Sequence, residues 1–77
     1  MKWTAIQWGS ELYEWVMVTS GHWSLIGHDA VVFSTARGWG AMVNGKFLSY
    51  YPTRRKAMEA AIGYLAYERR QKEAEVG

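Results

Sequence analysis

The sequence contains no cysteine, only one proline and no long hydrophobic run. The absence of cysteine excludes disulfide bonds and thiolate metal sites, so stability must come from packing, from oligomerisation or from both. No apolar segment approaches the roughly 20 residues of a membrane span, and MKWTAIQW lacks the apolar stretch of a signal peptide. We therefore expect a soluble, cytoplasmic protein that has no membrane partner.

The composition is that of a globular domain with an excess of aromatic residues. Hydrophobic residues make up 49% of the 77 residues and charged residues 21%, which is not a disordered composition. So short a chain cannot bury two cores, and we expect one domain over residues 1–77. Aromatic residues reach 16%, and such side chains are enriched at interfaces and at stacking platforms for nucleic acid.

Between residues 12 and 51, short β-rich runs alternate with turn signals. The run LYEWVMVT precedes Ser20-Gly21, and GWGAMV precedes Asn44-Gly45. Asn-Gly between apolar runs is the strongest short-range hairpin signal, because both central residues of a type I′ turn need a positive φ. The pattern predicts an antiparallel β-meander of four to six strands. Residues 1–10 stay ambiguous, since KWTAIQW fits either a further strand or a short helix.

After Pro52 the hydrophobic period becomes that of a helix. Thr53 is a suitable N-cap. Four apolar residues then follow at the i, i+3, i+4, i+7 spacing of one helical stripe: Met58, Ala61, Ile62 and Leu65. The pattern predicts one long C-terminal helix over residues 53–73. The predicted fold class is therefore α+β, with this helix packed on one face of the meander.

Both faces of the last hairpin are apolar, and one helix can cover only one of them. A two-residue loop at Asn44-Gly45 predicts four cross-strand pairs: Val43 with Lys46, Met42 with Phe47, Ala41 with Leu48, and Trp39 with Tyr50. We expect the helix to cover the face that bears Gly38, Gly40, Met42, Phe47, Ser49 and Tyr51. This choice leaves Trp39, Leu48 and Tyr50 as an exposed platform, and one β-bulge would invert it.

His22 and His28-Asp29 are the residues that suggest catalysis or a metal. They lie at opposite ends of one short predicted strand, and no cysteine, third histidine or acidic pair completes a zinc site. The sequence also lacks a glycine-framed nucleophile and a phosphate-cradling loop. We interpret both histidines as residues that flank turns, and we expect a protein that is not an enzyme and uses no cofactor or metal.

Positive charge is concentrated in the second half of the chain. Residues 36–56 contain five cations and no acid: Arg37, Lys46, Arg54, Arg55 and Lys56. The last three fall in the first turn of the predicted helix, an end that favours acidic residues. One interpretation is a phosphate site, which Arg37 and Lys46 extend if these ends converge. The other is a solvated helical turn whose long side chains cover apolar edges.

The segment GWGAMVNGKFLSYYPTRRKAMEAAIGYL, residues 38–65, resembles the sheet-plus-helix DNA-binding domains of the AP2 and integrase arm-type group. Its order of strand, turn, strand and helix is also similar to that of many small phage-encoded proteins. The resemblance implies a sheet that enters the major groove with the helix packed behind it, and it places only Trp39 and Lys46 at DNA contacts. The hairpin strands carry few arginines, which departs from the pattern of that group.

Two functional hypotheses follow, and both describe non-catalytic binding. In the first, nucleic-acid phosphates bind the five cations Arg37, Lys46, Arg54, Arg55 and Lys56, with stacking on Trp39 and Tyr50. In the second, the aromatic and basic face docks on an intracellular protein, as in a small phage-type inhibitor or adaptor. A homodimer is consistent with either, because an uncovered apolar sheet face is costly in water.

Overall fold

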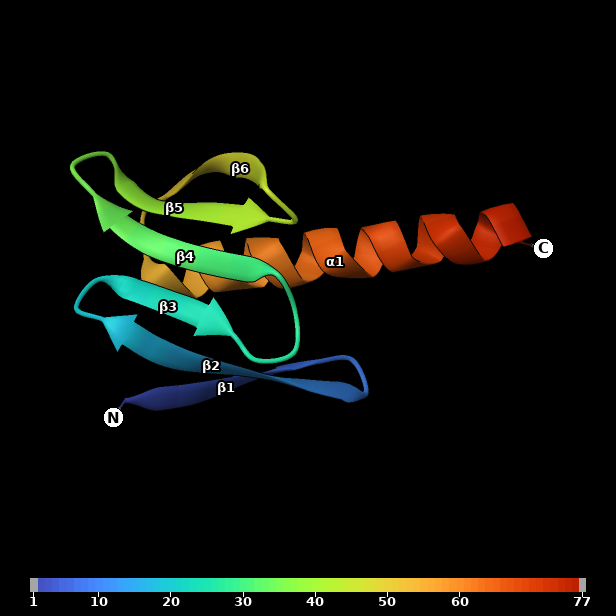
Figure 1. Cartoon of the computed structure of the whole chain (residues 1–77), viewed down its shortest axis with the longest axis horizontal. Coiled ribbons are helices and arrows are strands. Elements are labelled where there is room, and N and C mark those ends of the chain that lie inside the picture. The colour runs from blue at the N-terminus through green and yellow to red at the C-terminus, as the bar shows by residue number, and fades with distance from the viewer. Residues whose placement is uncertain (1, 77) are drawn as a thin grey trace.

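The computed structural model describes residues 2–76, and the side chains of residues 2–74, as one antiparallel sheet and one helix (Figure 1). The six strands pair in chain order: β1 (Trp3–Trp8), β2 (Glu11–Thr19), β3 (His22–Leu25), β4 (Ala30–Thr35), β5 (Gly38–Val43) and β6 (Lys46–Tyr51). Helix α1 (Arg54–Val76) follows. The predicted α+β meander is confirmed, and the ambiguous N-terminal segment forms a strand, β1.

The predicted turn at Asn44-Gly45 and the predicted N-cap at Thr53 are both present in the structure. Asn44 and Gly45 have φ values of 52° and 78°, as a type I′ turn requires. The Thr53 hydroxyl accepts a hydrogen bond of 3.1 Å from the backbone N–H of Lys56, which is the predicted N-cap. The helix continues to Val76, beyond the predicted end at residue 73. No helix among the described residues is long and apolar enough to cross a membrane.

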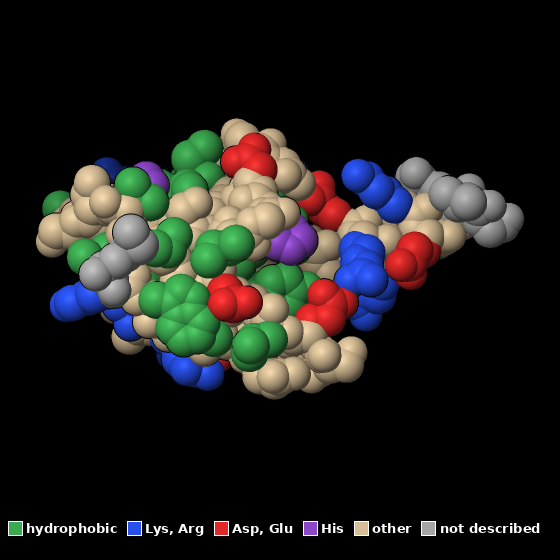
Figure 2. Space-filling model, turned by 60° about the horizontal axis from the view of Figure 1, so that its bottom comes forward, with side chains coloured by type: hydrophobic (Ala, Val, Ile, Leu, Met, Phe, Trp, Pro, Cys, Tyr) green, Lys and Arg blue, Asp and Glu red, His purple; other side chains and the backbone are tan. Residues whose placement is uncertain are grey.

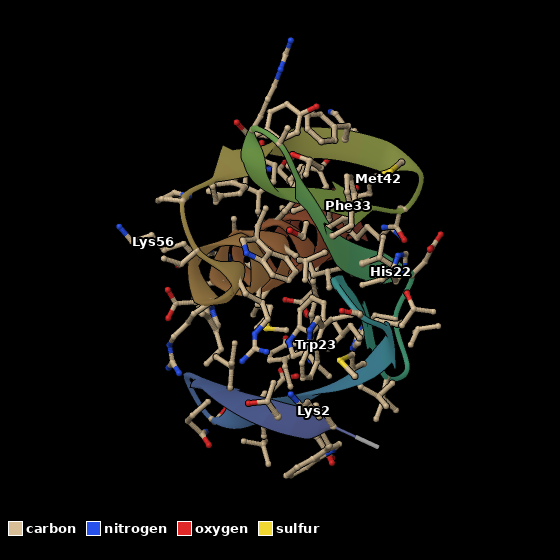
Figure 3. The ribbon with its side chains drawn as sticks, turned by 90° about the vertical axis from the view of Figure 1, so that its left-hand side faces the viewer. Lys2, His22, Trp23, Phe33, Met42 and Lys56 are labelled. Carbon is tan, nitrogen blue, oxygen red and sulfur yellow. The ribbon has the colours of Figure 1, made fainter. Side chains whose placement is uncertain are left out.

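The sheet is curved, and α1 lies in its hollow (Figure 3). Contacts at both edges of the sheet show why. On the β1 side, the indole of Trp8 lies over the helix at Gly63, where an added Cβ would be 3.5 Å from Trp8 Cζ2. On the β6 side, Asn44 Nδ2 donates a hydrogen bond of 2.9 Å to Glu68 Oε1. Because both edges reach the helix, the opposite face of the sheet is convex.

The hydrophobic core lies between this concave face and α1. Trp15 and Trp23 fill the space between β2, β3 and the helix, and both are buried. Beneath β4 and β5 the packing partners are small, which lets the helix lie close to these strands: Ala30, Val32, Ala41 and Val43 from the sheet, and Ala57 and Ala61 from the helix. The helix therefore approaches one half of the sheet closely, and bulky indoles fill the gap on the other half.

On β5 and at the start of β6 the helix covers the face opposite to the predicted one, whereas Tyr51 packs against the core and Tyr50 is exposed, as predicted. The pairs Val43–Lys46 and Met42–Phe47 form as predicted, but the register then shifts, so that Ala41 pairs with Ser49 and Trp39 with Tyr51. Trp39 and Leu48 thus pack against the core, whereas Tyr50 lies on the other face with Gly40. The prediction that the glycine-bearing face of β5 is covered was wrong. Glycine has no side chain to bury against a helix, whereas the opposite face of β5 buries Ala41 and Val43. Instead, Gly40 makes room for aromatic rings on the convex face.

Candidate interaction surfaces: an outer sheet face and a basic end

The convex side of the sheet, here called the outer face, bears many apolar side chains together with the polar side chains of Gln7, Glu14, His22 and Ser24. Strand alternation and the observed pairs place these apolar side chains on it: Trp3, Leu12, Val16, Val31, Phe33, Met42, Phe47 and Tyr50. Trp3 is 56% exposed and Leu12 57% exposed. In Figure 1, α1 passes behind the sheet, and no described segment covers this face. Figure 2 turns the β1 edge forward and shows large hydrophobic side chains exposed there.

Three aromatic side chains form a cluster on the outer face, here called the aromatic cluster: Phe33, Phe47 and Tyr50. The ring centroids are 6.4 Å apart for Phe33 and Phe47, and 4.9 Å apart for Phe47 and Tyr50, both in tilted arrangements. The cluster sits over Gly40, where an added Cβ would lie 2.7 Å from the Phe33 ring. The Arg37 guanidinium carbon lies 5.9 Å from the centre of the Tyr50 ring, within cation–π range.

Five cations lie at the end of the molecule where α1 begins, here called the basic end: Lys2, Arg37, Arg54, Arg55 and Lys56. They are spread over this end, where Lys2 and Lys56 occupy separate places (Figure 3). The Trp39–Tyr51 pair brings the β4–β5 turn next to the start of the helix. Lys2 joins them because its carbonyl accepts a hydrogen bond of 3.0 Å from the backbone N–H of Met17, which lies near the same end of β2. Figure 3 looks at this end, with Lys2 and Lys56 labelled. Sequence reasoning missed Lys2, because its place depends on the ambiguous first strand.

The three cations in the first helical turn have different environments. The Arg54 guanidinium lies 4.3 Å from the centre of the Trp23 ring, so this side chain covers the core. Arg55 Nε lies 3.3 Å from Glu59 Oε2, one turn further along the helix. The Lys56 side chain extends away from the body of the protein (Figure 3). Stacking on Trp23 therefore explains one cation at an unfavourable helix end, whereas Lys56 is exposed to solvent.

Replacing Arg54 by alanine is expected to lower the free energy of unfolding by about 1 kcal/mol, because Trp23 loses a cation–π partner and an apolar cover. Arg55→Ala, which breaks only an exposed ion pair, is expected to cost less than about 0.5 kcal/mol. Urea unfolding followed by circular dichroism measures both variants. Equal losses in the two variants would show that the Trp23 contact adds no stability.

Lys46 and Trp39 do not join the other predicted site residues. Lys46 begins β6 and Tyr51 ends it, so these residues are about 17 Å apart. The Lys46 ammonium lies 5.6 Å from the centre of the Tyr64 ring in α1, on the helix side of the sheet. Trp39 packs against the core on that same side. Neither residue that the resemblance placed at DNA lies on the outer face.

The far end of the protein contains paired charges beside two shallow pockets of about 330 and 230 Å³. Arg69 forms ion pairs with Glu11 in β2 and with Glu73 in α1. The Tyr13 hydroxyl donates a hydrogen bond of 3.4 Å to Glu11, and burial followed by the charge of Glu11 raises the pKa of Tyr13. These contacts tie α1 to the β1–β2 hairpin. Among the described residues, no group of three potential ligands could hold a metal ion.

Comparison of the chain with protein-family models, with curated proteins and with solved structures found no match. The resemblance to the AP2 and integrase arm-type group therefore stays a prediction. Two surfaces are candidates for function, the outer face and the basic end.

Proposed function

We propose that the protein is a non-catalytic interaction module whose outer face docks on another protein. The observation that supports this most directly is the uneven cover of the sheet: one face packs on α1, and the other bears exposed large side chains. Six strands about 4.8 Å apart and about 17 Å long have a flat area of roughly 400 Å². Apolar side chains make up part of this area, which also bears Glu14, His22 and Ser24, and exposed apolar patches on small proteins commonly mark binding sites.

The shape and charge of this surface define the kind of partner that fits. A convex face needs a concave apolar groove. Arg37 stands beside the aromatic cluster and Lys2 precedes Trp3, so cations lie at the rim of the face. We therefore propose a groove with acidic residues along one side, since opposite charges favour encounter and orientation. A chain without cysteine suits the reducing cytoplasm, where we place this partner.

Within the outer face, the aromatic cluster is the proposed centre of binding. Phe47 and Tyr50 are each 41% exposed, so docking would remove a large part of two rings from water. Aromatic side chains and arginine are enriched among the few residues that contribute most of the binding free energy of an interface. The rings already contact one another, so little side-chain freedom is lost on binding.

Site-specific photo-crosslinking in cells tests the proposal. A benzophenone side chain at Phe47 is expected to give one discrete adduct, which excess wild-type protein suppresses and the Phe47→Asp/Tyr50→Asp variant does not. The matched control places the same group at Tyr67, which is 53% exposed on the helix. If adducts are the same from both positions, or if the double variant competes as well as wild type, the outer face is not the docking surface.

Nucleic-acid binding at the basic end is the second candidate function. The observation that favours it is that five cations lie at the end of the molecule where α1 begins, and that one of them, Arg37, lies beside the Tyr50 ring. Several phosphate contacts would make the affinity for a labelled oligonucleotide fall about a hundredfold between roughly 50 and 200 mM salt. Arg37→Glu/Lys56→Glu should abolish this binding, whereas Arg70→Glu/Lys72→Glu at the far end makes the same charge change and should preserve it. Absence of binding at the lower salt concentration removes this candidate.

A further inference from the structure

The two edges of the sheet are protected to very different degrees. At one edge, β6 begins with Lys46, shifts register beside Leu48 and is followed by Pro52, three devices that discourage pairing with a further strand. At the other edge, β1 has the sequence WTAIQW, without charge or proline, and its register with β2 is regular along its whole length. An uncharged edge with a regular register of this kind is a template for another strand.

The backbone groups that β1 offers can be identified from one hydrogen bond. The carbonyl of Lys2 accepts from the N–H of Met17, so Lys2 points its backbone groups toward β2. In an antiparallel pair this direction alternates. The backbone N–H and C=O groups of Trp3, Ala5 and Gln7 therefore point outward. β1 is the edge strand of the sheet. In Figure 1 it crosses β2 at the lower border, and no described segment other than β2 runs beside it.

We infer that two copies of this chain pair antiparallel through their β1 strands. A two-fold axis perpendicular to the sheet relates the strands, and Ala5 lies on it, opposite Ala5 of the second copy. Trp3 then pairs with Gln7 of the second copy, and the N–H and C=O groups of all three outward residues are used. A shift toward the turn leaves at least one of the three without a strand partner, because Gly9 and Ser10 form that turn.

The side chains of β1 suit this arrangement. Residues that lie directly opposite each other come close together, and on the axis the two side chains are only methyl groups. A two-fold axis perpendicular to the sheet also keeps equivalent faces on the same side. The two outer faces then join across twelve strands, six from each copy, and both helices lie on the opposite side. The dimer does not depend on the proposed docking function, but it would present two docking surfaces together.

Mass measurement by light scattering during gel filtration tests the inference. The wild-type protein is expected to have twice the mass of one 8.8 kDa chain. Ala5→Pro should be monomeric and folded, because the Ala5 N–H takes no part in the β1–β2 ladder. Ala5→Glu should be monomeric, since two added carboxylates meet on the axis and each also lies opposite Glu14 of its own chain, and an equimolar mixture with Ala5→Lys should form dimers again. This mixing result decides the question even if the proline variant fails to fold.

Hydrogen exchange gives a readout for each residue. In the dimer, the amides of Trp3, Ala5 and Gln7 should exchange about tenfold or more slowly than in Ala5→Glu, whereas those of Thr4, Ile6 and Trp8 should be protected in both. A monomeric wild type across the micromolar range overturns the inference. So does a dimer that Ala5→Glu retains and that Phe47→Asp dissociates, because that result indicates contact through the outer faces.

Discussion

Replacing Trp15 by alanine is expected to lower the free energy of unfolding by about 3–5 kcal/mol. Trp15 is fully buried and is the largest such side chain in the protein. It fills the gap that the curved sheet leaves between β2 and α1, so its removal creates a cavity that the strands cannot close. Domains of this size are marginally stable, and Trp15→Ala should therefore be substantially unfolded in urea concentrations that leave the wild type folded. Urea titration followed by far-ultraviolet circular dichroism measures the loss.

Trp15→Phe separates the size of this side chain from its polarity. The indole Nε1 of Trp15 is buried, and no described protein group accepts a hydrogen bond from it. Phenylalanine removes this unsatisfied donor, which offsets part of the loss of volume. We expect Trp15→Phe to cost less than about 2 kcal/mol. A loss as large as that of Trp15→Ala would show that the indole nitrogen stabilises the fold and that packing is not the dominant contribution.

The elements of this fold could be predicted because their signals are local. Asn44-Gly45 determines a turn by the φ values of two adjacent residues. Thr53 and the stripe that includes Met58 and Ile62 determine the start and the buried side of a helix within three turns. The covered face of the last hairpin could not be predicted in this way. Both faces of β5 are apolar, so alternation alone does not show that Ala41 and Val43 lie on the covered face. The register shift beside Leu48 then changes which face Tyr50 and Tyr51 occupy.

In the candidate surfaces, too, the local features could be predicted from the sequence and the contacts between distant segments could not. A run of cations at the helix start is visible in the sequence, but the stacking of Arg54 on Trp23 joins the helix to a distant strand. Lys2 reaches the basic end only through the pairing of β1 with β2. Lys46 lies close to the other cations in sequence but is separated from them by the length of β6. Closeness along the chain therefore predicted that one end of the protein is basic, but it did not predict which cations lie there.

Replacing Gly38 by alanine is expected to lower the free energy of unfolding by about 2–4 kcal/mol, from two effects that act together. Gly38 has a φ of 115°, a conformation that residues with a Cβ rarely adopt, and an added Cβ would lie 2.6 Å from the backbone oxygen of Tyr51. That oxygen cannot rotate away as a side chain could. To relieve the clash, the end of β6 must move away from β5. Thermal and urea unfolding of the purified variant measure the loss.

Gly45→Ala is the matched control, because Gly45 has a φ of 78° but open space around the position of an added Cβ. It should show the cost of positive φ alone, about 1–2 kcal/mol. Equal losses in both variants would mean that the contact with Tyr51 is relieved without cost. A larger loss in Gly38→Ala would show that the junction of β6 with α1 is rigid. This junction holds Tyr50 on the outer face and Arg54 at the basic end, so Gly38 would then position both surfaces relative to each other.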